Sequence, residues 1–209
     1  MLLRHGRTAD NAGGRMQGQL DTPLDDLGLA QAAAAAQVLA GLAPAVLLTS
    51  DLSRARDTAQ ALEAATGQQA LVDPRLRELH LGSWQGLTGE EAAAQHPEEH
   101  AAWRAGKDVV RGGGETYRDA AERSVACLDD HLGDLGAGQT LVAVTHGGTA
   151  RATIGLLLEL PDIHWGRLAP LGNACWSVLV EAEWGWRLER HNADAGPITA
   201  PLTPGAQPL

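Results

Sequence analysis

The chain has 209 residues and a hydrophobic content of 44%, which allows one sizeable core and is typical of a globular protein. No stretch approaches the ~18 consecutive apolar residues of a membrane span, and none has the form of a secretory signal, so we expect a cytoplasmic protein. The formal net charge of −10 argues against nucleic acid or an anionic membrane surface as a partner.

The chain opens with a short apolar run that ends in Arg4-His5-Gly6. An apolar run that stops at glycine is typical of a buried strand, so we expect Arg4 and His5 at its carboxyl end, where α/β sheets hold ligands. Arg4 has a permanent planar charge that suits phosphate oxygens, and His5 has a ring nitrogen that is nucleophilic near neutral pH. Gly6 has no side chain to keep an anion away from the backbone.

Helices and short strands alternate along the next part of the chain. We predict an Ala-rich helix over 27–42, a buried strand over 46–48, a helix over 52–66 that stops at Gly67, and a strand over 71–72. The polar residues 49–51 offer caps for the second helix. Arg54, on the first turn of that helix, would add positive charge where a helix N-terminus already favours an anion.

Residues 79–114 are irregular and rich in glycine, so we expect loops and short helices that form a lid over one end of the sheet. A long helix over 116–135 and the strongest strand, 140–144, follow. This strand runs into His146-Gly147, and a helix over 149–158 comes next. Two further runs, 175–180 and 184–190, are typical of a hairpin at a sheet edge.

This order predicts a three-layer α/β/α sandwich with a mainly parallel sheet and one antiparallel edge strand. We expect a single domain over 1–193, with the lid inserted at about 79–114 and a Pro-rich tail over 194–209. Cys127 and Cys175 have no metal-binding spacing, which favours buried free thiols. The hairpin at the sheet edge offers a surface for a homodimer.

Four segments would meet at one edge of this sheet, because parallel strands end on the same side. They resemble the motifs of the histidine phosphatase superfamily, in its phosphoglycerate-mutase-like branch, in the order of that family and over most of the chain. The segments are Arg4-His5-Gly6, Ser50-Asp51-Leu52-Ser53-Arg54-Ala55, Leu76-Arg77-Glu78 and Thr145-His146-Gly147.

The resemblance implies that His5 is the nucleophile that becomes phosphorylated and that Glu78 is the general acid and base. It implies that Arg4, Arg54 and His146 hold the phosphoryl oxygens. Polar groups near the phosphate complete the expected substrate-binding set, which consists of Asn11, Gln17, Gly18 and Gly147. The sequence has no HExxH motif or clustered metal-ligand pattern, so we expect a metal-independent reaction with no cofactor.

The resemblance favours a phosphatase over a mutase, because the mutases are longer in the segment that follows the Glu78 position. Residues 15–24 and 79–88 are similar to those of actinobacterial phosphatases that act on glucosyl-3-phosphoglycerate, so we expect a phosphorylated glycerate or sugar as substrate. A cofactor-dependent phosphoglycerate mutase, an α-ribazole or broad-specificity phosphatase, and a non-catalytic binder of a phosphorylated ligand remain alternatives. A dinucleotide enzyme would need GxGxxG after the first strand, which is missing.

Overall fold

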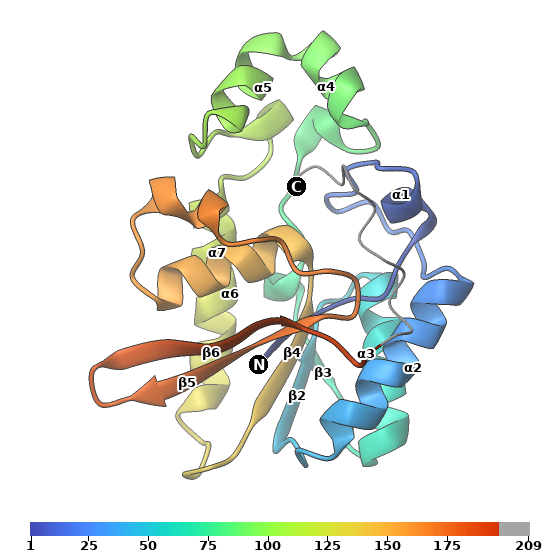
Figure 1. The fold of residues 1–209 in the computed structure, drawn as a ribbon, viewed down its shortest axis with the longest axis vertical. Coiled ribbons are helices and arrows are strands. Elements are labelled where there is room, and N and C mark those ends of the chain that lie inside the picture. The colour runs from blue at the N-terminus through green and yellow to red at the C-terminus, as the bar shows by residue number, and fades with distance from the viewer. Residues whose placement is uncertain (197–209) are drawn as a thin grey trace.

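The computed structural model describes residues 1–196, which form a six-stranded sheet with helices on both faces (Figure 1). The predicted tail lies almost wholly outside the described residues. The strand order is β3-β2-β4-β1-β5-β6. The strands are β1 (Leu2–Arg4), β2 (Val46–Thr49), β3 (Leu71–Val72), β4 (Leu141–Thr145), β5 (Trp176–Ala182) and β6 (Gly185–Ala193).

The first four strands of the chain run parallel, and β5 is antiparallel to both of its neighbours, β1 and β6. The predicted fold class is therefore confirmed, and the antiparallel part is the hairpin expected near 175–190. β1 has only three residues, but it lies in the middle of the sheet and pairs with β4 on one side and β5 on the other. His5, which follows β1, is thus anchored between two strands.

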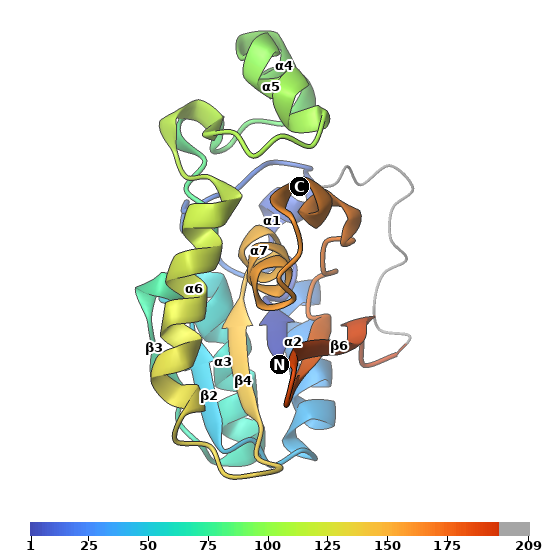
Figure 2. The same ribbon diagram turned by 90° about the vertical axis from the view of Figure 1, so that its left-hand side faces the viewer.

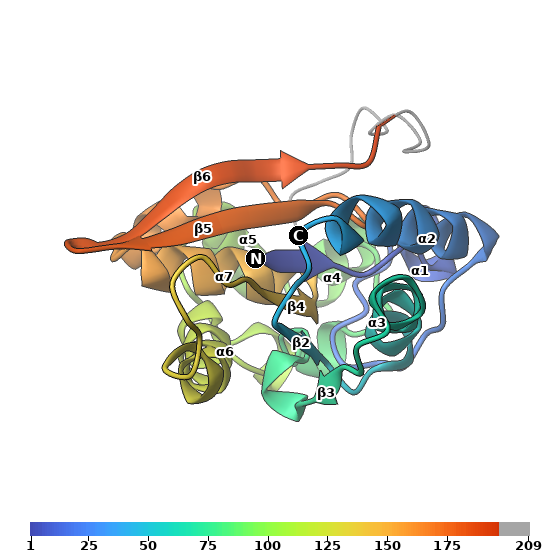
Figure 3. The same ribbon diagram turned by 90° about the horizontal axis from the view of Figure 1, so that it is seen from below.

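Two pairs of helices cover the two faces of the sheet (Figure 3). Side chains that alternate along each strand point to opposite faces, and Leu2 and Leu3 accordingly belong to two separate buried clusters. Leu3 packs with α2 (Asp26–Ala40) and α3 (Ser53–Thr66), and Leu2 packs with α6 (Tyr117–Leu132) and α7 (Gly147–Leu157). The central strands β1, β2 and β4 are buried and largely apolar because helices cover both of their faces.

The N-terminus of α3 differs from the sequence expectation. We expected residues 49–51 to cap it, but the backbone N–H of Ser53 donates to Asp21 Oδ1 at 2.7 Å. Asp51 instead pairs with Arg77 at the surface. A loop from elsewhere in the chain therefore supplies the cap, and an aspartate already lies at the helix end where we had expected an anion.

The segment predicted as a lid contains two short helices above the carboxyl ends of the parallel strands (Figure 2). Trp84 is fully buried there and packs edge-to-face on Trp103, with ring centroids 5.8 Å apart. The elements of this lid segment are η2 (Gly82–Trp84), α4 (Gly89–Gln95), α5 (Pro97–Arg104) and η3 (Arg111–Gly113). The short elements outside it are α1 (Ala9–Ala12), η1 (Pro74–Leu76) and η4 (Asp162–Arg167).

Two further expectations concern the cysteines and the membrane. Cys127 and Cys175 are both buried and free, as predicted. Within residues 1–196, none of the helices combines the length and the apolar character that crossing a bilayer requires.

Candidate active site

The sheet brings His5 and His146 together. β1 and β4 are parallel neighbours in which Arg4 lies opposite Thr145, so the next residue of each strand leaves the sheet at the same point. The two imidazole rings have centroids 5.1 Å apart and are tilted by 58°. The expectation that both histidines emerge at one edge of the sheet agrees with this geometry.

A hydrogen bond fixes the tautomer of His5. Its Nδ1 lies 2.7 Å from the carbonyl oxygen of Gly6, and because a carbonyl only accepts, Nδ1 carries the proton and Nε2 keeps a free lone pair. Burial, followed by the charges of Arg54 and Arg4, lowers the pKa of His5 well below its usual value. His5 is therefore neutral and nucleophilic at Nε2 near neutral pH.

Gly6 contributes through helix packing. A Cβ at this position would lie 2.3 Å from the carbonyl oxygen of Gly28 in α2, and its N–H donates to Thr58 Oγ1 at 3.0 Å. We expected the absence of a side chain to serve the approach of an anion, whereas the contact in the structure is with a helix. This close contact fixes the backbone next to His5.

His146 contacts the guanidinium group of Arg54. The Nε–H of Arg54 donates to His146 Nδ1 at 3.2 Å, so the ring proton is on Nε2, which lies 2.9 Å from Ser50 Oγ. Burial and then the charges of Arg54 and His5 lower the pKa of His146 well below its usual value. His146 is fully buried, and its two nitrogens orient an arginine and contact a serine. A direct contact of His146 with a phosphoryl oxygen stays a prediction.

Arg54 and Arg4 place two positive charges beside His5. The other nitrogens of Arg54 donate to the carbonyl oxygens of Leu20 at 2.6 Å and Gly18 at 2.8 Å. Burial lowers the pKa of Arg54 to about 10, so it stays charged at neutral pH. Arg4 donates to the carbonyl oxygen of Leu171 at 2.6 Å, and its buried Nε has no hydrogen-bond partner within the described residues. This arrangement leaves N–H groups available to an anion.

Glu78 is held at the N-terminus of α7. Its Oε2 accepts from the N–H of Gly148 at 3.0 Å, and its Oε1 accepts from the N–H of Thr149 at 2.9 Å. The hydroxyl of Thr149 and the N–H of Leu79 add two more hydrogen bonds. A Cβ on Gly148 would lie 2.8 Å from Glu78 Oε1, so only glycine leaves room for the carboxyl group in this position.

One cavity of about 30 Å³ is lined by six of the predicted site residues, which are Arg4, His5, Gln17, Gly18, Arg54 and Glu78. Gln17 is buried, and its Oε1 accepts from Thr8 Oγ1 at 3.1 Å. Gly18 contributes the carbonyl that binds Arg54. The structure thus gathers residues from β1, α3 and two loops around His5.

Two of the predicted binding residues lie outside this lining. The Oδ1 of Asn11 accepts from the N–H of Thr8 at 3.2 Å and from Asn173 Nδ2 at 2.9 Å, so Asn11 caps α1 and fixes a loop. Gly147 lies against Arg4, and a Cβ there would be 3.4 Å from the guanidinium carbon. Contacts of Asn11 and Gly147 with a substrate stay predictions.

Sequence reasoning missed six residues of the cavity lining, and two of these, Arg111 and Tyr117, have polar side chains. The guanidinium carbon of Arg111 lies 4.7 Å from the centre of the Tyr117 ring, and Arg111 is only 3% exposed. A buried arginine needs a partner for its charge. The one signal in the sequence was an arginine directly before Gly112-Gly113-Gly114, in a segment that has no periodicity.

Clusters of three or more His, Cys, Asp or Glu suited to a metal do not occur among residues 1–196.

Known proteins are similar to this chain in sequence and in fold. The profile of the histidine phosphatase superfamily (branch 1) matches residues 1–194. A glucosyl-3-phosphoglycerate phosphatase of Mycolicibacterium vanbaalenii is 43% identical, over 93% of this chain and 94% of that protein. A metal-independent phosphoserine phosphatase of Arabidopsis thaliana is 38% identical, over 73% of this chain and 65% of that protein. The solved structure of a mycobacterial glucosyl-3-phosphoglycerate phosphatase complexed with VO3 superimposes with a TM-score of 0.87, at 43% identity and over 92% of this chain and 98% of that one.

Proposed function

The chain belongs to branch 1 of the histidine phosphatase superfamily and is a phosphatase, and we propose that it hydrolyses glucosyl-3-phosphoglycerate through a phosphorylated His5. The observation that carries the proposal is the shared cavity of His5, Arg4, Arg54 and Glu78. The substrate comes from relatives that are 43% identical over more than nine-tenths of the chain.

In the proposed first step, the lone pair of His5 Nε2 attacks phosphorus in line with the leaving oxygen. The phosphorus–oxygen ester bond breaks, and the carboxyl proton of Glu78 passes to that oxygen, so that the product leaves as a neutral alcohol. Arg4 and Arg54 stabilise the charge on the equatorial phosphoryl oxygens. The hydrogen bond from Nδ1 to Gly6 stabilises the positive charge that the ring gains.

In the proposed second step, the Glu78 carboxylate takes a proton from water while the water oxygen attacks phosphorus. The phosphorus–nitrogen bond breaks and its electron pair returns to His5 Nε2. Inorganic phosphate leaves, and Glu78 has regained its proton. Both steps use residues of this chain alone, and we expect neither a metal nor another cofactor.

A panel of phosphomonoesters tests the proposal. Glucosyl-3-phosphoglycerate, 3-phosphoglycerate, phosphoserine and α-ribazole phosphate are assayed for phosphate release, and 3-phosphoglycerate is also assayed for isomerisation. We expect the highest kcat/KM for phosphate release from glucosyl-3-phosphoglycerate. A predominant isomerisation would identify a mutase, and a preference for phosphoserine or α-ribazole phosphate would reject the proposed substrate.

The nucleophile is tested with the His5→Ala variant. We expect no turnover from this variant, and we expect acid-labile phosphate on the wild-type protein that is missing from the variant. Turnover of His5→Ala at the wild-type rate would end the assignment. His131→Asn, which changes a half-buried histidine near the end of α6 and outside the cavity lining, is the matched control and should behave as the wild type.

The cytoplasmic location and the homodimer are also proposals. The hairpin of β5 and β6 supports the second, because Trp184 at its turn is 71% exposed and Val180 is 40% exposed. A large exposed aromatic side chain is typical of an interaction surface. Light scattering of the wild type and of Trp184→Ser tests the dimer.

A further inference from the structure

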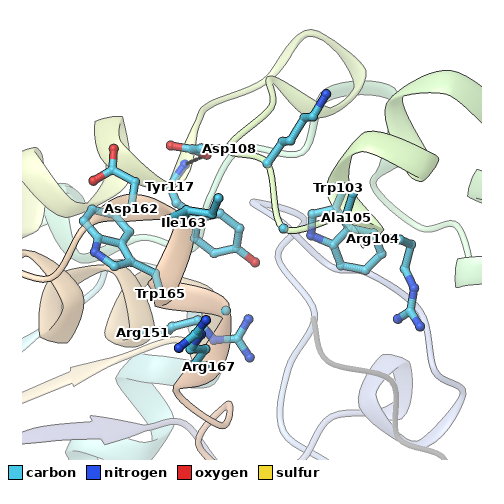
Figure 4. Close-up of a pocket in the computed structure, with 13 residues that line it drawn as sticks. Trp103, Arg104, Ala105, Asp108, Tyr117, Arg151, Asp162, Ile163, Trp165 and Arg167 are labelled. Carbon is cyan, nitrogen blue, oxygen red and sulfur yellow. Dashed lines mark hydrogen bonds between the residues drawn. The ribbon is translucent and has the colours of Figure 1, made fainter.

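A second and larger cavity adjoins the one at His5. It has a volume of about 290 Å³ and lies between the end of α5 with the loop that follows, the start of α6, and η4 (Figure 4). Tyr117 lines both cavities. The space at His5, about 30 Å³, is small compared with the 300 Å³ or more of a typical ligand pocket. The larger cavity beyond Tyr117 therefore offers room for the other groups of a substrate whose phosphate lies at His5.

The charges around the larger cavity favour an anion. Its lining includes four cations, Arg104, Lys107, Arg151 and Arg167, and two carboxylates, Asp108 and Asp162. Both carboxylates are already engaged by the protein itself. Asp108 accepts from the backbone N–H groups of Tyr117 and Arg118, and Asp162 accepts from the Arg118 side chain.

Arg151 links the two cavities electrostatically. It is a buried residue of α7, and after burial its charge is among the causes that lower the pKa of Arg4. Arg4 lines the cavity at His5 and Arg151 lines the larger one. In Figure 4, Arg151 and Arg167 both reach the cavity from below the Tyr117 ring. An anionic group close to the phosphate would meet these two guanidinium groups.

Three aromatic side chains enclose the same space and are held by their neighbours. The Nε1–H of Trp165 donates to the carbonyl oxygen of Leu160 at 2.9 Å, Trp103 packs on Trp84, and Arg111 covers one face of Tyr117. The Tyr117 hydroxyl points into the gap between Trp103 and Trp165 (Figure 4). Rigid aromatic rings with one polar group suit a ligand that has an apolar face and hydroxyl groups.

We propose that this cavity binds the leaving alcohol of the substrate, with Arg151 and Arg167 on a carboxylate and with Trp103, Tyr117 and Trp165 around a sugar ring. The proposal rests on the proposed function and narrows it to phosphomonoesters whose alcohol carries both groups. A phosphorylated glycerate has its carboxylate two carbon atoms from the phosphorylated carbon, which fits a cationic site that directly adjoins His5. We call this space the leaving-group cavity.

The carboxylate part is tested with Arg167→Ala, because Arg167 is exposed at the end of η4 and lies outside the cavity at His5. We expect kcat/KM for glucosyl-3-phosphoglycerate to fall at least about tenfold, as the loss of one charge-assisted hydrogen bond implies. For p-nitrophenyl phosphate, which has no carboxylate, kcat/KM should fall far less than for glucosyl-3-phosphoglycerate. Arg190→Ala, which removes an exposed cation on β6, is the matched control and should change neither.

The sugar part is tested with Trp103→Leu. We expect the wild type to prefer glucosyl-3-phosphoglycerate to 3-phosphoglycerate, and the variant to lose most of this preference. The measured quantity is the ratio of the two kcat/KM values, so a general loss of activity in the variant cancels. If both variants hydrolyse the glucosylated substrate as the wild type does, the leaving-group cavity is rejected and the phosphatase assignment stands. If the wild type releases no phosphate from any of these esters, the proposed function itself fails.

Discussion

Glu78 has a double task in the proposed reaction, and its surroundings show how one side chain can serve it. The carboxyl group accepts four hydrogen bonds, from Gly148, from the N–H and the hydroxyl of Thr149, and from Leu79. These donors hold the group at the edge of the cavity that it shares with His5. A carboxyl group held in this way can exchange a proton with the leaving oxygen and then with water while the backbone stays in place.

We predict that Glu78→Gln separates substrates by their leaving groups. The amide has the same shape but has no acidic proton to transfer, so an alkyl phosphate should be hydrolysed about 10²- to 10⁴-fold more slowly. p-Nitrophenolate leaves as a stable anion, so formation of phosphohistidine from p-nitrophenyl phosphate should change far less. Rapid-mixing measurements of the p-nitrophenolate burst, beside steady-state rates for glucosyl-3-phosphoglycerate, check this.

Glu90→Gln is the matched control, because Glu90 is an exposed residue of α4 outside the cavity lining. It should leave both rates unchanged. If Glu78→Gln lowered the burst rate with p-nitrophenyl phosphate as much as the steady-state rate with glucosyl-3-phosphoglycerate, the role of Glu78 as the acid would be contradicted and a role in positioning would be indicated.

At the scale of elements, the start of α7 sets the position of Glu78. The first turn of a helix has unpaired N–H groups and a partial positive charge, both of which favour a carboxylate. The side chains of Glu78 and Leu79 lie close to the backbone of Gly148, since a Cβ on Gly148 would lie 2.7 Å from Leu79 Cδ1 and 2.8 Å from Glu78 Oε1. Glycine at 148 is therefore required by the position of the Glu78 side chain rather than by the helix itself.

We predict that Gly148→Ala displaces Glu78 and lowers kcat by about 100-fold, which is the cost of a displacement of about 1 Å at a reacting group. Helix propensity favours alanine, so the loss cannot come from the helix. In the double variant Glu78→Gln, Gly148→Ala, kcat should be little lower than in Glu78→Gln alone, because both substitutions act through the side chain at position 78. Gly133→Ala, where the added Cβ meets open space, is the control. Additive losses in the double variant would contradict this explanation.

The elements that could be predicted are those with a repeating pattern. Apolar runs that end in His-Gly place His5 and His146 correctly, because strand direction fixes where each side chain emerges. Arg54 and Glu78 follow from the resemblance to the family. The loop contacts could not be predicted. Asp21 caps α3, Asn173 contacts Asn11, and Arg111 and Tyr117 line the cavity. Each of these contacts involves a residue in or beside an irregular segment, where no periodic pattern shows which residues meet.

At the scale of the whole molecule, the protein has a net charge of −10, yet positive charge is concentrated around the small cavity at His5. Three arginines, Arg4, Arg54 and Arg111, line the small cavity, where Glu78 is the acidic residue of the lining. All three are buried, so their charges act on a ligand with little screening. A local cluster therefore outweighs the repulsion that the surface as a whole exerts on a phosphorylated substrate.

The same burial makes the stability of the protein depend on pH. His5 and His146 are neutral in the folded state because their pKa values lie well below 6.5, whereas in the unfolded chain each takes up a proton near pH 6.5. As the pH falls below about 6.5, the unfolded state binds more protons than the folded one, so stability decreases. For two such groups the slope approaches about 2.7 kcal/mol per pH unit.

We predict that the free energy of unfolding, measured with urea between about pH 7 and about pH 5, falls in this way, because histidines titrate in this range and most carboxyl groups do not. The double variant His5→Gln, His146→Gln should have a flatter dependence, whatever its absolute stability, since both histidines are gone. The slope that remains includes the share of the Met1 amino group, whose pKa burial lowers to about 5. The control variant His131→Asn, at a half-buried histidine, should keep the wild-type slope. A wild-type slope in the double variant would show that the acid sensitivity lies elsewhere and that the two rings are not held neutral by burial.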